Sequence, residues 1–168
     1  VWDDGEDQYL RVIDYKRGGK SLKLSDAYYG LRLQLPVYLA AALKKRGAHS
    51  AGVYYFNLGE GILATQTTDG NAVEAERQKA FRMEGLLPDD PELLSAMSPQ
   101  FEEVLKARVT SSGALYKGTL CTDEKGFQRL IDHAIHCAED HLENIRTGHA
   151  AVAPARNGTT DPCIYCDY

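Results

Sequence analysis

Residues 9–16 read YLRVIDYK, an apolar segment that ends with a carboxylate and an ammonium two positions apart. Side chains of a strand alternate between its faces, so Asp14 and Lys16 project from one face and Ile13 and Tyr15 from the other. A carboxylate that can bind a hard cation, next to a lysine, suits metal-assisted hydrolysis of a phosphodiester. A three-residue D-x-K motif often occurs by chance. The competing interpretation is a surface ion pair on an edge strand.

An amphipathic segment follows at residues 25–46. Ser25 is a suitable N-cap, and leucines that recur every four residues predict a helix with a core-facing stripe: Leu31, Leu35, Leu39 and Leu43. Gln34 and Tyr38 form a second row, so their polar ends emerge on one side of the helix. The competing interpretation makes Gln34 a solvated position and Tyr38 a core aromatic. Pro36 predicts a bend in this helix.

The rest of the sequence alternates predicted strands and helices. Gly47 is a C-cap, and the aromatic run within 52–58 predicts a strand covered on both faces. A strand, helix, strand order predicts a right-handed crossover. Further expected elements are a strand near 61–66, a helix at about 74–83, a turn at 85–90, a helix at 91–97, a strand pair around 112–113, and a long helix capped by Thr122 that runs to about 147. The apolar residues predicted to form the buried side of this long helix are Phe127, Leu130, Ile131, Ala134, Ile135, Ala138, Leu142 and Ile145.

The composition is typical of one soluble globular domain. The 168 residues are 43% hydrophobic and 26% charged, which is enough for a real core. No segment is apolar enough to span a bilayer, so no membrane partner is expected, and cysteines without a secretory context favour a reducing cytoplasm. The formal net charge of −5 is unusual for a DNA-binding protein. Basic residues nevertheless gather around the charged pair: Lys16, Arg17, Lys20 and Lys23.

Four segments, in this order, resemble one nuclease family: LRVIDYK at 10–16, YYGLRLQLPVYLAAAL at 28–43, AGVYYFNL at 51–58 and GLLPDDPELLSAM at 85–97. They are similar to the C-terminal nuclease domain of AddB-type proteins of helicase-nuclease complexes, in the RecB-like branch of the PD-(D/E)XK nuclease superfamily. The resemblance extends from about Tyr9 to the terminal CIYCDY. In that family a Q-x-x-x-Y helix follows the D-x-K strand, and Gln34 and Tyr38 match it.

The resemblance implies an α/β fold with a PD-(D/E)XK restriction-endonuclease-like core, in which helices flank a mixed sheet. The family's first acidic strand and the helix before it are missing, and the Asp4-Gly5 dipeptide marks the turn after that strand. The chain is therefore expected to be a fragment of a larger polypeptide, with an incomplete metal site. Three aspartates are predicted to form a solvated turn rather than substitute ligands: Asp3, Asp4 and Asp7. A single nuclease domain is expected over 1–168, with a core at about 8–66, a helical region at about 74–148 and a tail at 149–168.

The resemblance also implies the roles of individual residues. Asp14 would bind Mg²⁺ or Mn²⁺, with the main-chain carbonyl of Tyr15 as a further ligand. Lys16 would position or activate the attacking water, Gln34 would hydrogen-bond within the site or to the DNA backbone, and Tyr38 is a further candidate. These roles are chemically reasonable, because a bound metal lowers the pKa of its water and a cation offsets charge that builds on the scissile phosphate.

The last residues contain a C-x-x-C pair, Cys163 and Cys166, which brings two thiolates within reach of one metal or cluster. The pair alone also fits half a zinc site or a redox pair. The resemblance implies two of the four ligands of a [4Fe-4S] cluster. Cys121 and Cys137 are predicted to be buried small side chains. Three histidines lack the spacing of metal ligands and are predicted to be solvated or partly buried: His133, His136 and His141.

The implied function is a metal-dependent DNA exonuclease domain of a helicase-nuclease complex that processes double-strand breaks for recombinational repair in the cytoplasm. Its substrate would be a single strand of unwound duplex, and its partner an AddA-type helicase-nuclease protein. The alternative is a non-catalytic module that guides DNA or contacts protein. The set of Asp14, Lys16 and Gln34 favours the nuclease, whereas the missing first carboxylate favours the alternative for this chain.

Overall fold

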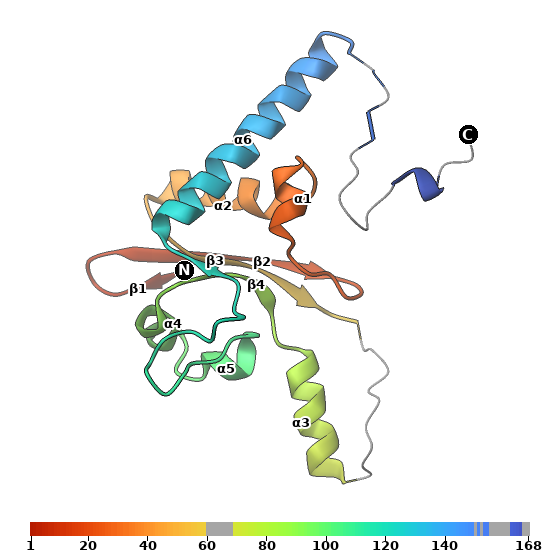
Figure 1. The fold of residues 1–168 in the computed structure, drawn as a ribbon. Coiled ribbons are helices and arrows are strands. Elements are labelled where there is room, and N and C mark those ends of the chain that lie inside the picture. Colours follow the sequence, from red (N-terminus) through yellow and green to blue (C-terminus); the bar gives the residue numbers. More distant parts are fainter. Residues whose placement is uncertain (60–68, 150, 152, 155–161, 166–168) are drawn as a thin grey trace.

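The computed structural model describes residues 1–59, 69–149, 151, 153–154 and 162–165, in which a five-stranded mixed sheet lies between helices (Figure 1). The expected α/β class is confirmed. The strands, in sheet order, are β1 (Trp2–Asp3), β2 (Gln8–Lys16), β3 (His49–Asn57), β4 (Glu84–Pro88) and β5 (Cys121–Thr122). The helices are α1 (Leu24–Tyr28), α2 (Gln34–Arg46), α3 (Gly70–Ala80), α4 (Pro91–Met97), α5 (Phe101–Val104) and α6 (Glu124–Arg146), with a 3₁₀ turn, η1 (Pro162–Tyr165).

The parallel pair β2 and β3 forms the centre of the sheet, and α2 lies in the connection between them. β1 pairs antiparallel with β2, β4 pairs antiparallel with β3, and β5 pairs parallel with β4. The register aligns Asp14 with Tyr55 and Tyr55 with Glu84, so these three side chains start from the same face of the sheet. Helices α1, α2 and α6 lie on one side of the sheet, and α4 and α5 lie on the other (Figure 1).

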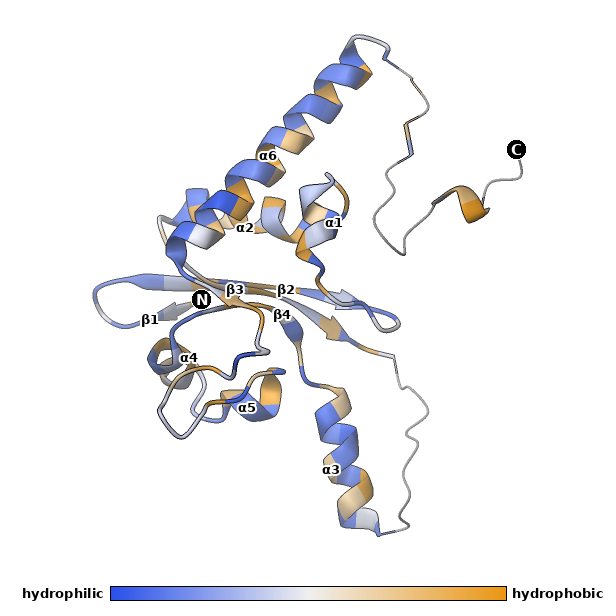
Figure 2. Ribbon diagram, viewed as in Figure 1, coloured by the Kyte–Doolittle hydropathy of each residue, from blue (hydrophilic) through white to orange (hydrophobic). Residues whose placement is uncertain are grey.

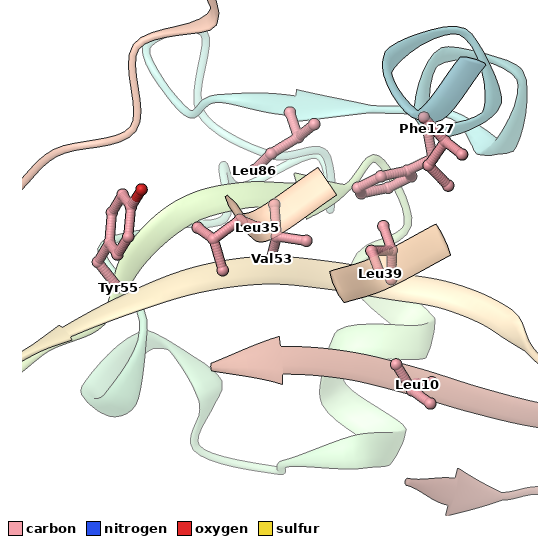
Figure 3. Packing of buried hydrophobic residues seen from close by; sticks show 8 residues of the cluster. Leu10, Leu35, Leu39, Val53, Tyr55, Leu86 and Phe127 are labelled. Carbon is pink, nitrogen blue, oxygen red and sulfur yellow. The ribbon is translucent and has the colours of Figure 1, made fainter. Parts of the chain in front are cut away.

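Two hydrophobic clusters fill the two sides of the sheet, because successive side chains of β3 alternate between them. The first cluster joins the sheet to α2 and α6 (Figure 3): Leu10, Leu35, Leu39, Val53, Tyr55, Leu86, Phe127 and Ile131. The second joins it to α4 and α5: Tyr54, Leu87, Leu94, Phe101, Leu105 and Ala107. Burying one large apolar side chain contributes roughly 1.5–3 kcal/mol. β3 is coloured mainly apolar, whereas α6 is mainly polar with apolar residues at intervals (Figure 2).

The single helix expected over 25–46 is wrong, because the chain forms α1 and α2 with a break at residues 29–33. Gly30 and Arg32 have positive φ values, 72° and 52°, which are incompatible with a continuous right-handed helix. The change of direction therefore precedes Pro36. This proline is the third residue of α2, where a missing N–H has no helical acceptor, so the helix tolerates it.

The turn expected at 85–90 is also wrong, because most of it belongs to strand β4. Leu86 and Leu87 are 2% and 3% exposed, one in each hydrophobic cluster. Gly85 resembled a turn signal, but it is required because a Cβ atom there would overlap the Val53 carbonyl. The strand pair expected around 112–113 is one antiparallel bridge between Val109 and Leu115.

Two helices begin at different residues than the sequence predicted. Helix α3 begins at Gly70, because the Asp69 side chain accepts the Asn71 N–H as an N-cap. Helix α6 is capped by Asp123 instead of Thr122, because the Asp123 carboxylate accepts the Gly126 N–H at 2.8 Å. The strand expected near 61–66 lies outside the described residues.

The last half of α6 extends past the sheet (Figure 1). Phe127, Ile131 and Ala134 in the first half are buried, as expected. Leu142 and Ile145 are 65% and 75% exposed, so the prediction that they face the core is wrong. The helix is longer than the sheet it covers, so its final turns extend beyond the layers formed by the described residues (Figure 1). Among the helices that the structure describes, none combines the length and apolar character needed to cross a bilayer.

Candidate active site

The charged pair predicted from the sequence lies at the C-terminal end of β2. Lys16 Nζ is 2.6 Å from Asp14 Oδ2, and the two side chains are 29% and 15% exposed. They project from the same face of the strand because they are two residues apart. In parallel sheets, ligands commonly bind beyond the carboxyl ends of the strands. The pair therefore occupies the edge of the sheet where a substrate can reach it.

Gln34 and Tyr38 meet this pair from α2. Lys16 Nζ donates a hydrogen bond to Gln34 Oε1 at 3.0 Å, and Gln34 Nε2 donates to the Tyr38 hydroxyl at 3.3 Å. The four predicted side chains thus form one continuous polar network: Asp14, Lys16, Gln34 and Tyr38. The break at residues 29–33 is what brings the first turn of α2 over the end of β2.

One carboxylate oxygen of the network, Asp14 Oδ2, is buried beside the Lys16 ammonium. Its contact with Lys16 is an ion pair that lacks the alignment of a hydrogen bond. The close contact with Asp14 raises the pKa of Lys16, although partial desolvation opposes this shift, so the lysine remains a cation. A buried carboxylate oxygen without an aligned donor fits a ligand for a hard cation.

The floor of the network is Tyr55 of β3, aligned with Asp14 across the sheet. Lys16 Nζ lies 5.8 Å from the centre of its ring, within cation–π range. Burial raises the pKa of Tyr55, while the positive charge of Lys16 lowers it by less. Its hydroxyl therefore remains neutral at ordinary pH. The ring closes the base of the site with an apolar surface.

Sequence reasoning missed Arg32, which borders the site. Its Nε atom lies 3.1 Å from Asp26 Oδ2, and the Asp26 side chain is only 6% exposed. The guanidinium makes no other hydrogen bond or ion pair with the described residues. Its charge acts on Tyr55 together with that of Lys16. The available signal was Gly30 inside a predicted helix, which marks a possible break; the positive φ at Arg32 has no comparable signature.

The described part of the chain contains no group of three histidine, cysteine, aspartate or glutamate side chains arranged to hold a metal. The acidic turn at residues 3–7 is exposed and structural, as expected: Asp3 accepts the Gly5 N–H, and Asp4 accepts those of Glu6 and Asp7. Mg²⁺ is commonly bound by one or two carboxylates, with water and substrate phosphates as further ligands. The donors present therefore fit part of a magnesium site.

The remaining candidate residues have different surroundings. The Tyr15 side chain points away from the network, 63% exposed and edge-on to Phe56. Cys163 is exposed in η1, while Cys166 lies outside the described residues, so the cluster remains a prediction. Cys121 and Cys137 are half-buried instead of buried.

The three histidines predicted to be ordinary helix positions contact neighbouring groups. Ring nitrogens of His133 and His141 lie 3.0 Å and 3.5 Å from the main-chain oxygens of Tyr28 and Gly30, and His136 lies 3.4 Å from Asp140 Oδ2. The first two therefore help to hold α1 and the break after it against α6.

Comparison with known proteins supports the architecture. The family description "PD-(D/E)XK nuclease superfamily" matches residues 2–168. The B-type component of the ATP-dependent helicase/deoxyribonuclease of Thermoanaerobacter sp. (strain X514) is 32% identical over 177 residues, which cover 100% of this chain and 15% of that protein. The proteins of the same name from Desulforudis audaxviator and Moorella thermoacetica are 38% and 34% identical over 170 residues, 95% of this chain and 15% of each relative. The chain thus spans about 15% of the length of these relatives.

Proposed function

Because the chain belongs to the PD-(D/E)XK nuclease superfamily, we propose that it hydrolyses DNA phosphodiester bonds with the help of a divalent metal. The observation that carries this proposal is the network of Asp14, Lys16, Gln34 and Tyr38 at the end of β2, in which a buried carboxylate oxygen lies 2.6 Å from the Lys16 ammonium. An ordinary surface ion pair does not require that a carboxylate oxygen be buried. The arrangement instead suits a site that receives a metal and a phosphate together.

Asp14 and the main-chain carbonyl of Tyr15 would hold the metal. Bound there, Mg²⁺ or Mn²⁺ would lower the pKa of a coordinated water and polarise the scissile phosphate. Lys16 supplies a fixed positive charge beside the carboxylate, where negative charge builds in the transition state. Its protonated state suits electrostatic stabilisation and orientation of the attacking water better than removal of a proton.

Gln34 and Tyr38 act as positioning residues in this proposal. The Tyr38 hydroxyl accepts from Gln34 Nε2, which turns Oε1 of the same amide toward Lys16. The amide then holds Lys16 Nζ by a hydrogen bond to a charged donor, which is stronger than one between neutral groups. Arg32, anchored by the buried Asp26 carboxylate, can contact a neighbouring phosphate through its Nη atoms.

The complex and the partner that we propose for this chain are based on its relatives, whose names describe one component of an ATP-dependent helicase/deoxyribonuclease. We propose that this chain acts within such a complex in the cytoplasm, on a single strand released from unwound duplex during break repair. An AddA-type helicase-nuclease protein would be its partner. Cys163 and Cys166 would supply two ligands of a [4Fe-4S] cluster that holds the tail in place.

The test is degradation of linear DNA in Mg²⁺ or Mn²⁺ by the chain assembled in its helicase-nuclease complex. Asp14→Ala should abolish degradation, whereas the matched control Asp140→Ala, which removes an exposed carboxylate of α6, should leave it unchanged. Asp14→Asn should also be inactive while preserving size and polarity, which separates loss of metal binding from loss of packing. Undiminished cutting by purified Asp14→Ala would refute the assignment.

The second candidate is a non-catalytic module that guides DNA. It is favoured by one observation: the described residues contain no group of three histidine, cysteine, aspartate or glutamate side chains that could hold a metal. Calorimetry separates the two: a nuclease site should bind Mn²⁺ in the chain alone at about millimolar concentration, as expected of an incomplete carboxylate cage, and Asp14→Asn should remove that binding. A guiding module would show no dependence of metal binding on Asp14.

A further inference from the structure

A hollow of about 270 Å³ lies where β4 begins, outside the network described above. Three of its lining side chains are basic and one is an exposed tyrosine: Arg82, Lys106, Arg108 and Tyr116. Ala107, Gly118 and Thr119 also line it, and none of the described residues of the lining is acidic. This concentration of positive charge occurs in a chain whose formal net charge is −5.

The charges of the hollow are only partly neutralised. Lys106 Nζ forms an ion pair with Glu84 Oε2 at 2.7 Å, but among the described residues Arg82 donates only to main-chain oxygens, those of Lys79 and Glu102. The side chain of Arg108 has no hydrogen bond or ion pair with the described residues. The nearby Glu102 carboxylate accepts the Val109 N–H at 2.6 Å and is thus engaged by the backbone. The two guanidiniums therefore lack carboxylate partners and can bind an anion.

Tyr116 makes the hollow more than a basic patch. Its ring is 61% exposed, while its main-chain N–H is fixed to the Arg108 oxygen at 2.8 Å. An exposed aromatic ring fixed beside arginines is the combination by which proteins hold single-stranded nucleic acid, since bases stack on the ring and phosphates meet the cations. An acidic peptide would use the cations and gain little from the ring.

The sheet connects this hollow to the network. Asp14 aligns with Tyr55, Tyr55 aligns with Glu84, and Glu84 pairs with Lys106. Neighbouring strands are about 4.8 Å apart, so the backbone of Glu84 lies on the order of 10 Å from that of Asp14. A strand of DNA with one phosphate at Asp14 can therefore reach the hollow within a few nucleotides.

We propose that the hollow formed by Arg82, Lys106, Arg108 and Tyr116 binds the backbone and one base of a single DNA strand, a few nucleotides from the phosphate that is cut. The proposal rests on the proposed nuclease function and adds a second contact that sets the path of the strand. Arg108 is the main phosphate contact and Tyr116 the stacking surface. The DNA strand would pass the beginning of β4, between the network and the loop of residues 106–119.

The test is binding of a fluorescein-labelled oligothymidylate of about 20 nucleotides in EDTA, where no cleavage occurs, followed by fluorescence anisotropy. Arg108→Glu should raise Kd about tenfold and reduce the slope of log Kd against log salt by about one. The matched control is Lys125→Glu, which makes the same change of charge at the opposite end of the sheet and should change Kd by less than about twofold. Circular dichroism melting checks that each variant folds.

Tyr116 identifies the class of ligand. Tyr116→Ala should weaken oligothymidylate binding about tenfold, and Tyr116→Phe should restore it, because the ring and not the hydroxyl stacks. Poly-glutamate serves as the competing ligand. If Arg108→Glu weakens poly-glutamate and oligothymidylate equally and Tyr116→Ala affects neither, the hollow belongs to an acidic protein segment and the proposal is overturned. Equal effects of Arg108→Glu and Lys125→Glu would also overturn it.

Failure of this proposal can be distinguished from failure of the nuclease assignment. If Arg108→Glu binds DNA like the wild type while Asp14→Asn abolishes cleavage, the nuclease assignment stands and the hollow does not bind the strand. If Asp14→Asn still cleaves while Arg108→Glu loses binding, the hollow stands as a DNA contact and the nuclease assignment fails.

Discussion

The two ends of the β2–β3 pair use acidic residues in opposite ways. At the C-terminal end, Asp14 lies beside a cation and keeps a buried oxygen without an aligned donor. At the N-terminal end, a hollow of about 310 Å³ beside Tyr9 and His49 is lined by four acidic residues: Asp89, Asp90, Asp123 and Glu124. Among the described residues, the first end combines Asp14 and Asp26 with the cations Lys16 and Arg32, whereas the second has four carboxylates around one hollow.

The aspartates of the N-terminal end have structural roles. Asp90 accepts the Leu93 N–H as the cap of α4, and Asp123 accepts the Gly126 N–H as the cap of α6. Asp4 closes the β1–β2 turn at the same end. Among the described residues, Asp14 has no backbone donor of this kind, and its buried Oδ2 atom contacts the Lys16 ammonium instead. The combination of burial and a cationic neighbour distinguishes it from the aspartates that cap helices and turns.

The comparison of the two ends also explains how a chain with a formal net charge of −5 can bind DNA. Four acidic residues line the hollow at the N-terminal end of the strands, while cations lie at the C-terminal end and in the hollow at β4. A nucleic acid would be repelled from one end and attracted to the other. The distribution of charge, and not its sum, determines where DNA binds.

The largest effect that distinguishes the two ends is expected from Lys16→Ala. Removing the cation at the C-terminal end should lower the rate of DNA degradation by about two to three orders of magnitude, because charge on the transition state loses its fixed partner. Lys125→Ala at the N-terminal end should leave the rate unchanged. A rate loss shared by both variants would remove the functional difference between the ends.

A smaller effect is expected from Gln34→Ala. Loss of the amide frees Lys16 Nζ from its 3.0 Å hydrogen bond, and degradation should slow about tenfold. The matched control, Gln128→Ala on α6, removes a surface hydrogen bond to Asp132 and should have no effect on the rate. Because Gln34 acts through Lys16, the double variant Lys16→Ala/Gln34→Ala should be no slower than Lys16→Ala alone. Additive losses would contradict a positioning role.

Asp123→Ala tests the structural role of the aspartates at the N-terminal end of the β2–β3 pair. Loss of the N-cap of α6 should lower the free energy of unfolding by about 1 kcal/mol in urea titrations, with DNA degradation unchanged at a temperature where the variant is folded. Asp123→Asn should restore most of the stability, because asparagine caps helices nearly as well. A variant of full stability but reduced cleavage would show that this end takes part in the chemistry.

The smallest effect concerns the Asp4 turn. Hydrogen bonds from the N–H groups of Asp7 and Glu6 lower the pKa of Asp4 below its ordinary 3.8. The folded state therefore prefers the carboxylate, and this stabilisation is complete above the ordinary pKa and is lost as pH falls through the lowered one. Between about pH 5 and about pH 3, the urea midpoint of Asp4→Asn should fall less than that of the wild type. An identical fall would assign the acid sensitivity to other groups.

Periodicity predicted the parts of the site that depend on one element at a time. The two-residue repeat of a strand placed Asp14 and Lys16 on one face, and the four-residue spacing of a helix paired Gln34 with Tyr38. The hydrogen bond from Lys16 to Gln34 depends on how α2 lies over β2, which the sequence does not encode locally. The resemblance to a family implied only that Gln34 hydrogen-bonds within the site or to the DNA backbone, and the structure identifies Lys16 as its partner.

The predictions from sequence were wrong where a local sequence signal opposes the burial of apolar side chains. Gly85, Pro88 and Asp89 look like a turn, yet the strand forms because Leu86 and Leu87 pack into both hydrophobic clusters. The leucine stripe from Leu31 to Leu43 predicted one helix, yet positive φ values at Gly30 and Arg32 divide it. In both places tertiary packing outweighs local preference.

By itself, the sequence determined the class of the fold, the strand that holds the carboxylate and lysine, and the helix that holds the amide and tyrosine. These features follow from spacing between near neighbours, which fixes the faces of a strand or helix before anything packs. Only the tertiary structure decided that Asp14 Oδ2 is buried, that Asp26 holds Arg32, and that Arg82, Arg108 and Tyr116 line one hollow. Burial and charge pairing between residues distant in the chain exist only once the elements are packed together.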